Sequence, residues 1–254
     1  LEAHARNEWS QQLRTPSKRY SDLLACVYRH IAEEWNISVS WDEAMTYGMS
    51  VEHWPAFPDS AEALAYLKEH YQLVILSNVD NASFTHSHAK LGVAFDGIYT
   101  AEDVGSYKPA AANFDYMLEK LATRGIGSGE ILHTAESMFH DHAPANRHGL
   151  KNCWIYRRHA DEGFGATMHP GDMPHYDFRF TSMADMVEAH RAELAGQPAR
   201  RGPVPLKAVQ DPDIAVGGIA ECRQRILVGV AVIGVDGGCR ARKFDQHGAR
   251  GLVT

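Results

Sequence analysis

Hydrophobic residues recur at helical spacing through the first part of the chain. Five of them form one apolar stripe: Tyr20, Leu23, Leu24, Val27 and Ile31. Such a stripe is typical of an amphipathic helix. Residues 40–43 read Ser-Trp-Asp-Glu, the Ser-x-x-Glu form of a capping box, which predicts that a second helix begins there. Prolines at positions 55 and 58 then break the spacing, so the pattern predicts a helical unit over residues 1–58.

From residue 59 onward, short apolar runs alternate with segments of helical spacing. We expect strands at 73–76, 96–100, 131–134, 153–156 and 178–180. We expect helices after residue 60 and around 82–91, 114–121, 142–149 and 183–194. Strands that alternate with helices predict an α/β fold with a parallel sheet. Because such sheets bind ligands at the carboxyl ends of their strands, candidate site residues should directly follow the apolar runs.

Composition narrows the class of protein. The 254 residues include 25 Lys+Arg and 32 Asp+Glu, for a net charge of −7, and this balance argues against a nucleic-acid-binding protein. No apolar run is long enough to cross a bilayer, and no signal peptide is visible. The four cysteines are widely scattered and form neither a disulfide framework nor a zinc pattern. We therefore expect a cytoplasmic protein with no membrane partner.

Charge is distributed unevenly along the chain. Residues 197–254 hold 9 Lys/Arg and 5 Asp/Glu, a net of +4, which leaves 16 and 27, a net of −11, for residues 1–196. The change falls at Gly196-Gln197-Pro198. We expect three parts: a helical unit at 1–58, an α/β core at 59–196, and an atypical, poorly ordered tail at 197–254.

Polar residues follow three of the predicted strands. Ser77 and Asn78 follow the first, Lys108 lies in the loop after the second, and Glu136 and Asp141 follow the third. Together they offer a hydroxyl, an amide, an ammonium and two carboxylates, which suits a small anionic substrate. The hydroxyl and amide can donate hydrogen bonds, Lys108 can neutralise an acid, and Asp141 can orient water.

Each of these residues also has an ordinary structural explanation. A Ser-Asn pair after a strand often caps a helix, and a lysine before a proline is usually a solvated loop residue. Asp141 could simply favour a helix N-terminus. Its neighbours His140 and His142 are weak support for a metal site, because the chain has 15 histidines. The order and spacing of the three pieces favour a functional interpretation.

Three motifs carry a family resemblance. Residues 76–78 (Leu-Ser-Asn), 104–109 (Val-Gly-Ser-Tyr-Lys-Pro) and 136–141 (Glu-Ser-Met-Phe-His-Asp) resemble motifs two, three and four of the haloacid dehalogenase superfamily. The type II 2-haloacid dehalogenase group is the most similar, and the resemblance extends over residues 1–194. It implies a Rossmann-like hydrolase core with residues 1–58 as part of a helical cap domain.

The resemblance also implies a reaction. In that group an aspartate attacks carbon 2 of a 2-haloacid and expels halide, and water then cleaves the ester to give a 2-hydroxy acid. By position, Ser77 and Asn78 would hold the substrate carboxylate, Lys108 would pair with the nucleophile, and Asp141 would position the water. Dehalogenation implies no cofactor, and related enzymes are often homodimers.

The family's first motif, a strand that ends in the nucleophilic aspartate, is missing. We therefore expect an N-terminally truncated protein that is inactive as given and whose sheet lacks its first central strand. A magnesium-dependent phosphatase is the alternative enzyme, in which Glu136 and Asp141 would share the cation. A non-catalytic remnant that binds a partner or a small acid is a third interpretation.

The tail contains one apolar segment. Residues 226–235 lead into Asp236-Gly237-Gly238, as though the missing motif had been permuted, which would put Gly234 in the position of the nucleophile. A replacement strand is therefore one interpretation. We favour a loosely ordered or out-of-frame tail, because low aromatic content and basic excess fit either.

Overall fold

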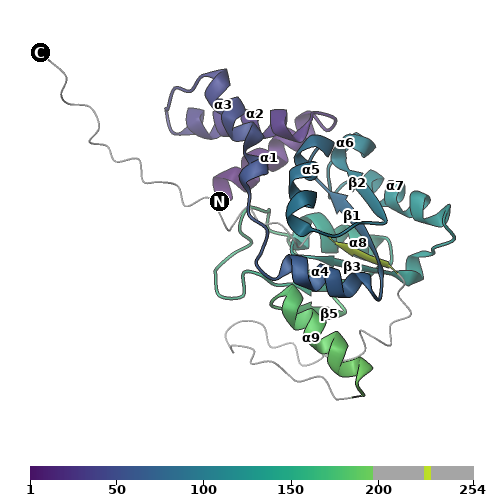
Figure 1. Cartoon of the computed structure of the whole chain (residues 1–254). Helices are drawn as coiled ribbons and strands as arrows, with labels where there is room; N and C mark the ends of the chain where they lie inside the picture. Colours follow the sequence, from purple (N-terminus) through teal and green to yellow (C-terminus); the bar gives the residue numbers. More distant parts are fainter. Residues whose placement is uncertain (197–225, 230–254) are drawn as a thin grey trace, which may run out of the picture.

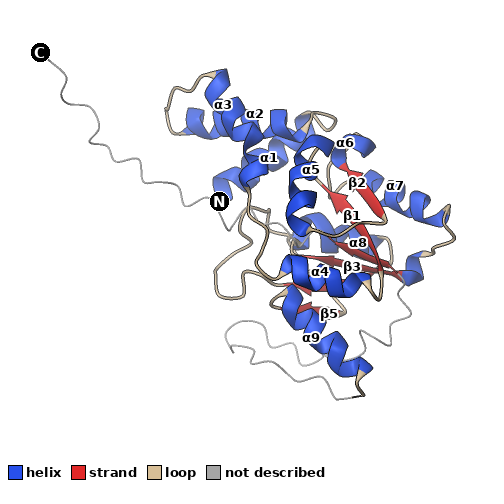
Figure 2. Cartoon of the chain, in the orientation of Figure 1, coloured by secondary structure: helices blue, strands red, loops and turns tan. Residues whose placement is uncertain are grey.

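A parallel six-stranded sheet forms the centre of the protein (Figures 1 and 2). The computed structural model describes residues 1–196 and 226–229. Its strands follow the order β2-β1-β6-β3-β4-β5, and each is parallel to its neighbours. Their bounds are β1 Gln72–Ser77, β2 Gly97–Thr100, β3 Ile131–Ala135, β4 Lys151–Ile155, β5 Phe178–Phe180 and β6 Ile226–Gly229.

Helices cover both faces of this sheet. The helices are α1 Glu2–Arg14, α2 Tyr20–Glu34, α3 Trp41–Gly48, α4 Ser60–Lys68, α5 Asn81–Leu91, α6 Ala101–Val104, α7 Ala111–Ala122, α8 Ala143–Arg147 and α9 Met183–Leu194. Buried side chains of α4, α5 and α9 pack on one face, and those of α7 and α8 pack on the other. None of these helices, within the part of the chain that is described, is long and apolar enough to span a bilayer.

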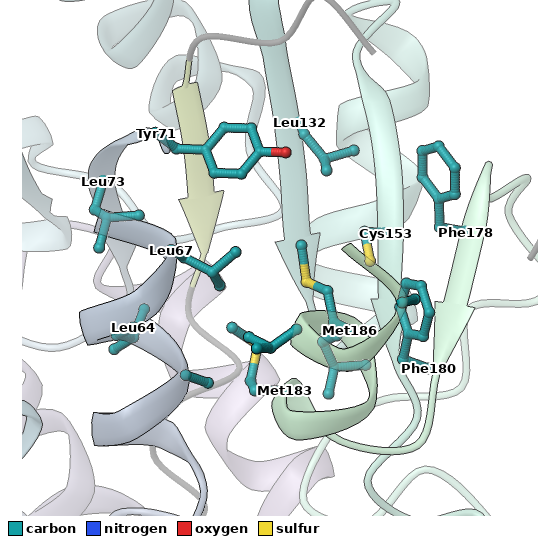
Figure 3. Packing of buried hydrophobic residues seen from close by; sticks show 14 of the residues in the cluster. Leu64, Leu67, Tyr71, Leu73, Leu132, Cys153, Phe178, Phe180, Met183 and Met186 are labelled. Atoms are coloured by element: carbon teal, nitrogen blue, oxygen red, sulfur yellow. The ribbon is translucent and has the colours of Figure 1, made fainter. Parts of the chain in front are cut away.

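Side chains along β1 alternate between the two faces of the sheet, and helices cover each face, so the protein has three layers. Leu73 belongs to the apolar cluster beneath α4 and α9, whereas Val74 and Leu76 belong to the cluster beneath α7. Successive residues of a strand point to opposite faces, so a strand covered on both sides must be apolar at nearly every position. Figure 3 shows the first cluster, in which residues of α4 and α9 meet over the strands, Leu67 and Met186 among them.

β6 occupies the middle of the sheet and corrects one expectation. It pairs with β1 through Leu73↔Leu227 and with β3 through Leu132↔Leu227. We expected the sheet to lack its central strand, but residues 226–229 fill that position. The physical reason is that the edges of β1 and β3 both carry unpaired backbone groups, which an added strand satisfies. The expectation that Gly234 stands in the nucleophile's position lies outside the described residues.

Most predicted elements appear close to their expected positions. β1, β2, β3 and β5 coincide with the predicted runs to within one or two residues, and the predicted helix at 183–194 is α9. β4 begins at Lys151, two residues before the apolar run that predicted it. The helix expected over 142–149 is shorter, at Ala143–Arg147, because a π-helical turn over Met138–His142 precedes it.

Helices α1 to α3 pack against the edge of the sheet where β1 and β2 end. Asp80, directly after β1, accepts a hydrogen bond of 2.9 Å from the backbone N–H of Ser21 in α2. Within this helical part, α3 approaches α2 so closely that a Cβ on Gly48 would lie 2.3 Å from the Ser21 carbonyl oxygen. The helices therefore have a fixed position over the edge at which the candidate residues gather.

One buried acid in these helices makes the stability of the fold depend on pH. Glu8 of α1 accepts a hydrogen bond of 3.0 Å from the Tyr20 hydroxyl, and burial raises the pKa of its carboxyl to about 7. Since the folded protein then holds a proton that the unfolded chain releases near pH 4.5, stability should fall as pH rises from about 4.5 to 7.

We expect the Glu8→Gln variant to lose this dependence. The contribution of Glu8 is up to ~3 kcal/mol between pH 5 and pH 8, an upper bound for a pKa shift of this size. Urea unfolding at the two pH values, in the variant and in an exposed-site control such as Glu62→Gln, measures the difference. If Glu8→Gln keeps the slope of the unsubstituted protein, Glu8 is not its source.

Candidate active site

Lys108 joins the segments that follow β1 and β3. Its side chain is buried, and its ammonium Nζ donates to the Leu76 carbonyl oxygen at 2.9 Å and to Asp141 Oδ1 at 2.6 Å. Leu76 lies in β1, and Asp141 lies in the turn after β3. Because the carboxyl ends of parallel strands share one edge, these contacts place an ammonium and a carboxylate together at the edge where ligands of such sheets bind.

Asn78 holds the Lys108 loop in place. The amide oxygen of Asn78 accepts from the Lys108 backbone N–H at 2.7 Å, and its amide nitrogen donates to the Lys108 carbonyl oxygen at 3.2 Å. These two hydrogen bonds satisfy both backbone groups of Lys108 and join two loops that are 30 residues apart in sequence. The structure thus uses the Asn78 amide to position Lys108, a role that the sequence did not indicate.

The Asp141 carboxylate stays ionised although it is buried. Burial alone would raise its pKa, but the positive charge of Lys108 and a hydrogen bond from His133 outweigh burial and hold the pKa well below its usual range. His133 Nε2 lies 3.1 Å from the same Oδ1 atom that Lys108 contacts. The site therefore holds a fixed negative charge beside a fixed positive charge.

The other sequence-predicted residues lie nearby without joining this ion pair. Ser77 is the last residue of β1, is buried, and its hydroxyl oxygen accepts a long hydrogen bond of 3.4 Å from the Val79 N–H. Glu136 follows β3 and is half-buried, and its backbone carbonyl accepts from the indole N–H of Trp154 at 2.9 Å. Ser77 is thus next in sequence to Leu76, whose carbonyl oxygen accepts from Lys108. The backbone of Glu136 is instead held by Trp154 of β4.

The donor set around Asp141 does not fit a metal ion. No group of three His, Cys, Asp or Glu side chains that could hold a cation occurs within residues 1–196 and 226–229. The Lys108 ammonium supplies positive charge at Asp141 Oδ1, so Oδ2 is the oxygen of this carboxylate that could contact a further ligand. Within the described part of the chain, Lys108 is therefore the group that balances the charge of Asp141.

Two further histidines follow β3. His140 receives a hydrogen bond from the Ser137 hydroxyl or donates one to it, at 3.3 Å, and His142 contacts the Ala135 carbonyl and the Asn152 side chain. Burial lowers the pKa of both imidazoles to about 4. Both rings are therefore neutral near pH 7 and add no positive charge to the site.

Aromatic contacts connect the N-terminal helices to this edge. Trp9 of α1 meets Phe139, in the turn after β3, edge to face with ring centroids 5.1 Å apart. Tyr107, next to Lys108, donates its hydroxyl to the Lys18 carbonyl and packs against Tyr20 of α2. The Lys108–Asp141 pair therefore lies between the sheet edge and the helices, where aromatic surroundings of low dielectric strengthen electrostatic interactions.

Sequence reasoning missed His133 altogether. It lies in β3, whose residues were interpreted only as an apolar run, yet its buried imidazole reaches Asp141. The available signal was a histidine at an inward position of a strand expected to be buried on both faces.

A family model described as haloacid dehalogenase-like hydrolase matches residues 6–133, which is 128 of the 254 residues. Comparison with curated protein sequences finds no match to the chain.

Several solved structures share the fold. An L-2-haloacid dehalogenase from Xanthobacter autotrophicus with chloropropionic acid covalently bound is 15% identical, with a TM-score of 0.61 over 75% of this chain and 84% of that one. A defluorinating L-2-haloacid dehalogenase is 17% identical, with a TM-score of 0.60 over 73% and 77%. A haloacid dehalogenase-like hydrolase from Bacillus subtilis bound to magnesium is 14% identical, with a TM-score of 0.57 over 72% and 78%.

The family match covers half of the chain, from α1 to the middle of β3, and so includes Ser77, Asn78 and Lys108. The matches to solved structures show the same Rossmann-like arrangement of a parallel sheet with covering helices. The chain belongs to the haloacid dehalogenase-like hydrolase family.

Proposed function

We propose that this chain is a 2-haloacid dehalogenase in lineage, and that its site binds small 2-halogenated carboxylic acids. The observation that carries the proposal is the buried Lys108–Asp141 ion pair at the carboxyl ends of β1 and β3. In dehalogenation by this family a lysine balances an attacking carboxylate and no metal is needed, which agrees with the donor set found here. Ser77, at the end of β1, would donate to the substrate carboxylate, with Asn78 holding the Lys108 loop beside it.

We further propose that the chain as given does not release halide. The reaction needs a carboxylate that attacks carbon 2 and forms an ester, and that carboxylate belongs at the end of the central strand. The central strand here is Ile226–Gly229, whose four residues include no acid. Asp141 is committed to Lys108 and His133, so it serves as a positioning group for water and not as the nucleophile.

We therefore expect the protein to bind a 2-haloacid without converting it to the 2-hydroxy acid. Titration of (S)-2-chloropropionate should perturb the NMR signals of residues around Ser77, and the neutral amide of the same acid should not. Ser77→Ala should weaken binding about tenfold through loss of one hydrogen bond to a charged group. Ser60→Ala, which removes an equally buried hydroxyl on α4, should leave the affinity unchanged.

Chloride release gives the complementary test. We expect no chloride from (S)-2-chloropropionate above the level of a Lys108→Ala control. Release above that level would overturn the proposed inactivity, and absence of any binding would overturn the substrate class.

The phosphatase alternative makes a different prediction. The magnesium-bound hydrolase from Bacillus subtilis shares this fold, so the alternative has a structural precedent. It requires hydrolysis of a phosphate monoester that EDTA abolishes and magnesium restores. The fit of Lys108 to Asp141 favours the dehalogenase lineage over this alternative.

A further inference from the structure

His133 is a polar residue in the interior of the sheet. It lies in the middle of β3, between β4 and β6, with its backbone in register with Asn152 and Val228. Its side chain is fully buried on the face that α7 covers, where the ring packs against Phe114 with centroids 5.2 Å apart. A histidine at such a position needs a hydrogen-bonding partner, since an unpaired polar group costs free energy there.

The partner is the carboxylate of the site. His133 Nε2 and Lys108 Nζ both contact Asp141 Oδ1, at 3.1 Å and 2.6 Å. No partner for His133 Nδ1 is found among the described residues. Since an ionised carboxylate only accepts hydrogen bonds, His133 Nε2 must carry the proton of this contact.

A buried ion pair needs further hydrogen bonds to be tolerated. Removing two charges from water costs several kcal/mol for each ion, and their attraction offsets this cost only with good geometry and satisfied lone pairs. His133 donates such a bond to Asp141 from strand β3. Lys108 donates to the same carboxylate from a loop. The two donors come from separate elements and together fix the direction of one carboxylate.

We propose that His133 is a positioning residue of this active site, whose Nε2–H fixes the Asp141 carboxylate beside Lys108. With Oδ1 bound by both donors, Oδ2 is the oxygen that Asp141 offers to water or substrate. The chemical consequence rests on the proposed function, whereas the positioning itself does not. His133 acts only through Asp141 and does not touch the substrate.

NMR of the unsubstituted protein, labelled with ¹⁵N at histidine, tests the positioning directly. We expect a proton on His133 Nε2, with signals that shift when Asp141→Asn replaces the acceptor. An Nε2 atom that carries no proton, or signals that Asp141→Asn leaves unchanged, would overturn the proposal. This measurement needs neither turnover nor a ligand.

Affinity for (S)-2-chloropropionate tests the consequence. His133→Phe removes the donor, and His133→Gln keeps an N–H near the position of Nε2. We expect about tenfold weaker binding in His133→Phe, the effect of losing one hydrogen bond to a charged group, and restored binding in His133→Gln.

A matched control separates positioning from general destabilisation. His190→Phe replaces another buried histidine, on α9, which bonds to Tyr66 and lies outside the site. It should not change the affinity. Equal losses in His133→Phe and His190→Phe, or no rescue by glutamine, would show a merely structural role. If the unsubstituted protein binds no haloacid, the proposed function fails, and the NMR result alone decides the role of His133.

Discussion

A chain that ends at Gly196 should lose the cooperative fold that the full chain has. The two differ by the segment that contains β6, which is the only connection within the described sheet between β2-β1 and β3-β4-β5. Without β6 the backbone groups along β1 and β3 lose their partners, and the apolar clusters on both faces open at the centre.

The expected loss in the free energy of unfolding is comparable to the whole stability of a domain, which is about 5–15 kcal/mol. Urea unfolding followed by circular dichroism, together with gel filtration, measures it. The shorter chain should show no cooperative transition and should aggregate through its open strand edges.

A proline in β6 provides an independent version of this test. Val228→Pro should destabilise the fold by at least ~1–3 kcal/mol, because proline removes a ladder hydrogen bond from a strand that has neighbours on both sides and leaves the partner carbonyl unpaired. Val228→Ala keeps the backbone N–H and should cost less. If the chain ending at Gly196 unfolds like the full chain, β6 does not complete the sheet.

Lys108→Met should produce the largest effect of any single substitution in the site. The change leaves the Asp141 carboxylate buried without its ammonium, and breaking a buried pair in this way typically costs about 3–5 kcal/mol. Urea unfolding at pH 7 measures the loss. Lys68→Met is the matched control, because the Lys68–Asp96 pair is about one-third exposed and such pairs contribute about 0–1 kcal/mol.

The pH dependence of this stability loss shows whether the buried charge of Asp141 causes it. In the unsubstituted protein Asp141 has a lowered pKa, so it stabilises the fold above the unfolded value near 4 and loses that contribution as pH falls. Without Lys108, burial favours the protonated acid, so the deficit of Lys108→Met should shrink on acidification. The double variant Lys108→Met/Asp141→Asn should recover part of the stability at pH 7. A Lys108→Met variant within ~1 kcal/mol of the unsubstituted protein would contradict a buried, uncompensated charge.

Local patterns predicted much of the fold. The four apolar residues from Leu73 to Leu76 predicted β1, and helical spacing after Met183 predicted α9 within its observed bounds. These elements are readable because their periodicity is set by neighbours in sequence and by burial on known faces.

Long-range pairing could not be predicted in the same way. The position of β6 depends on two edges that lie about 90 and 150 residues earlier in the chain, and nothing in Ile226–Gly229 itself identifies them. The use of the Asn78 amide on the Lys108 backbone is equally invisible, because it depends on how two loops meet. His133 was missed for a third reason, since its partner becomes apparent only when the turn after β3 returns over the strand.

The late position of β6 has a consequence for biosynthesis. A ribosome that has completed β3 at Ala135 must add 94 more residues before it reaches Gly229. At roughly 5–20 residues per second this takes on the order of 5–20 s. Throughout that interval the nascent chain lacks the strand with which β1 and β3 both pair in the folded protein. The native sheet can therefore close only after Gly229 has been synthesised, and until then the edges of β1 and β3 are open to aggregation.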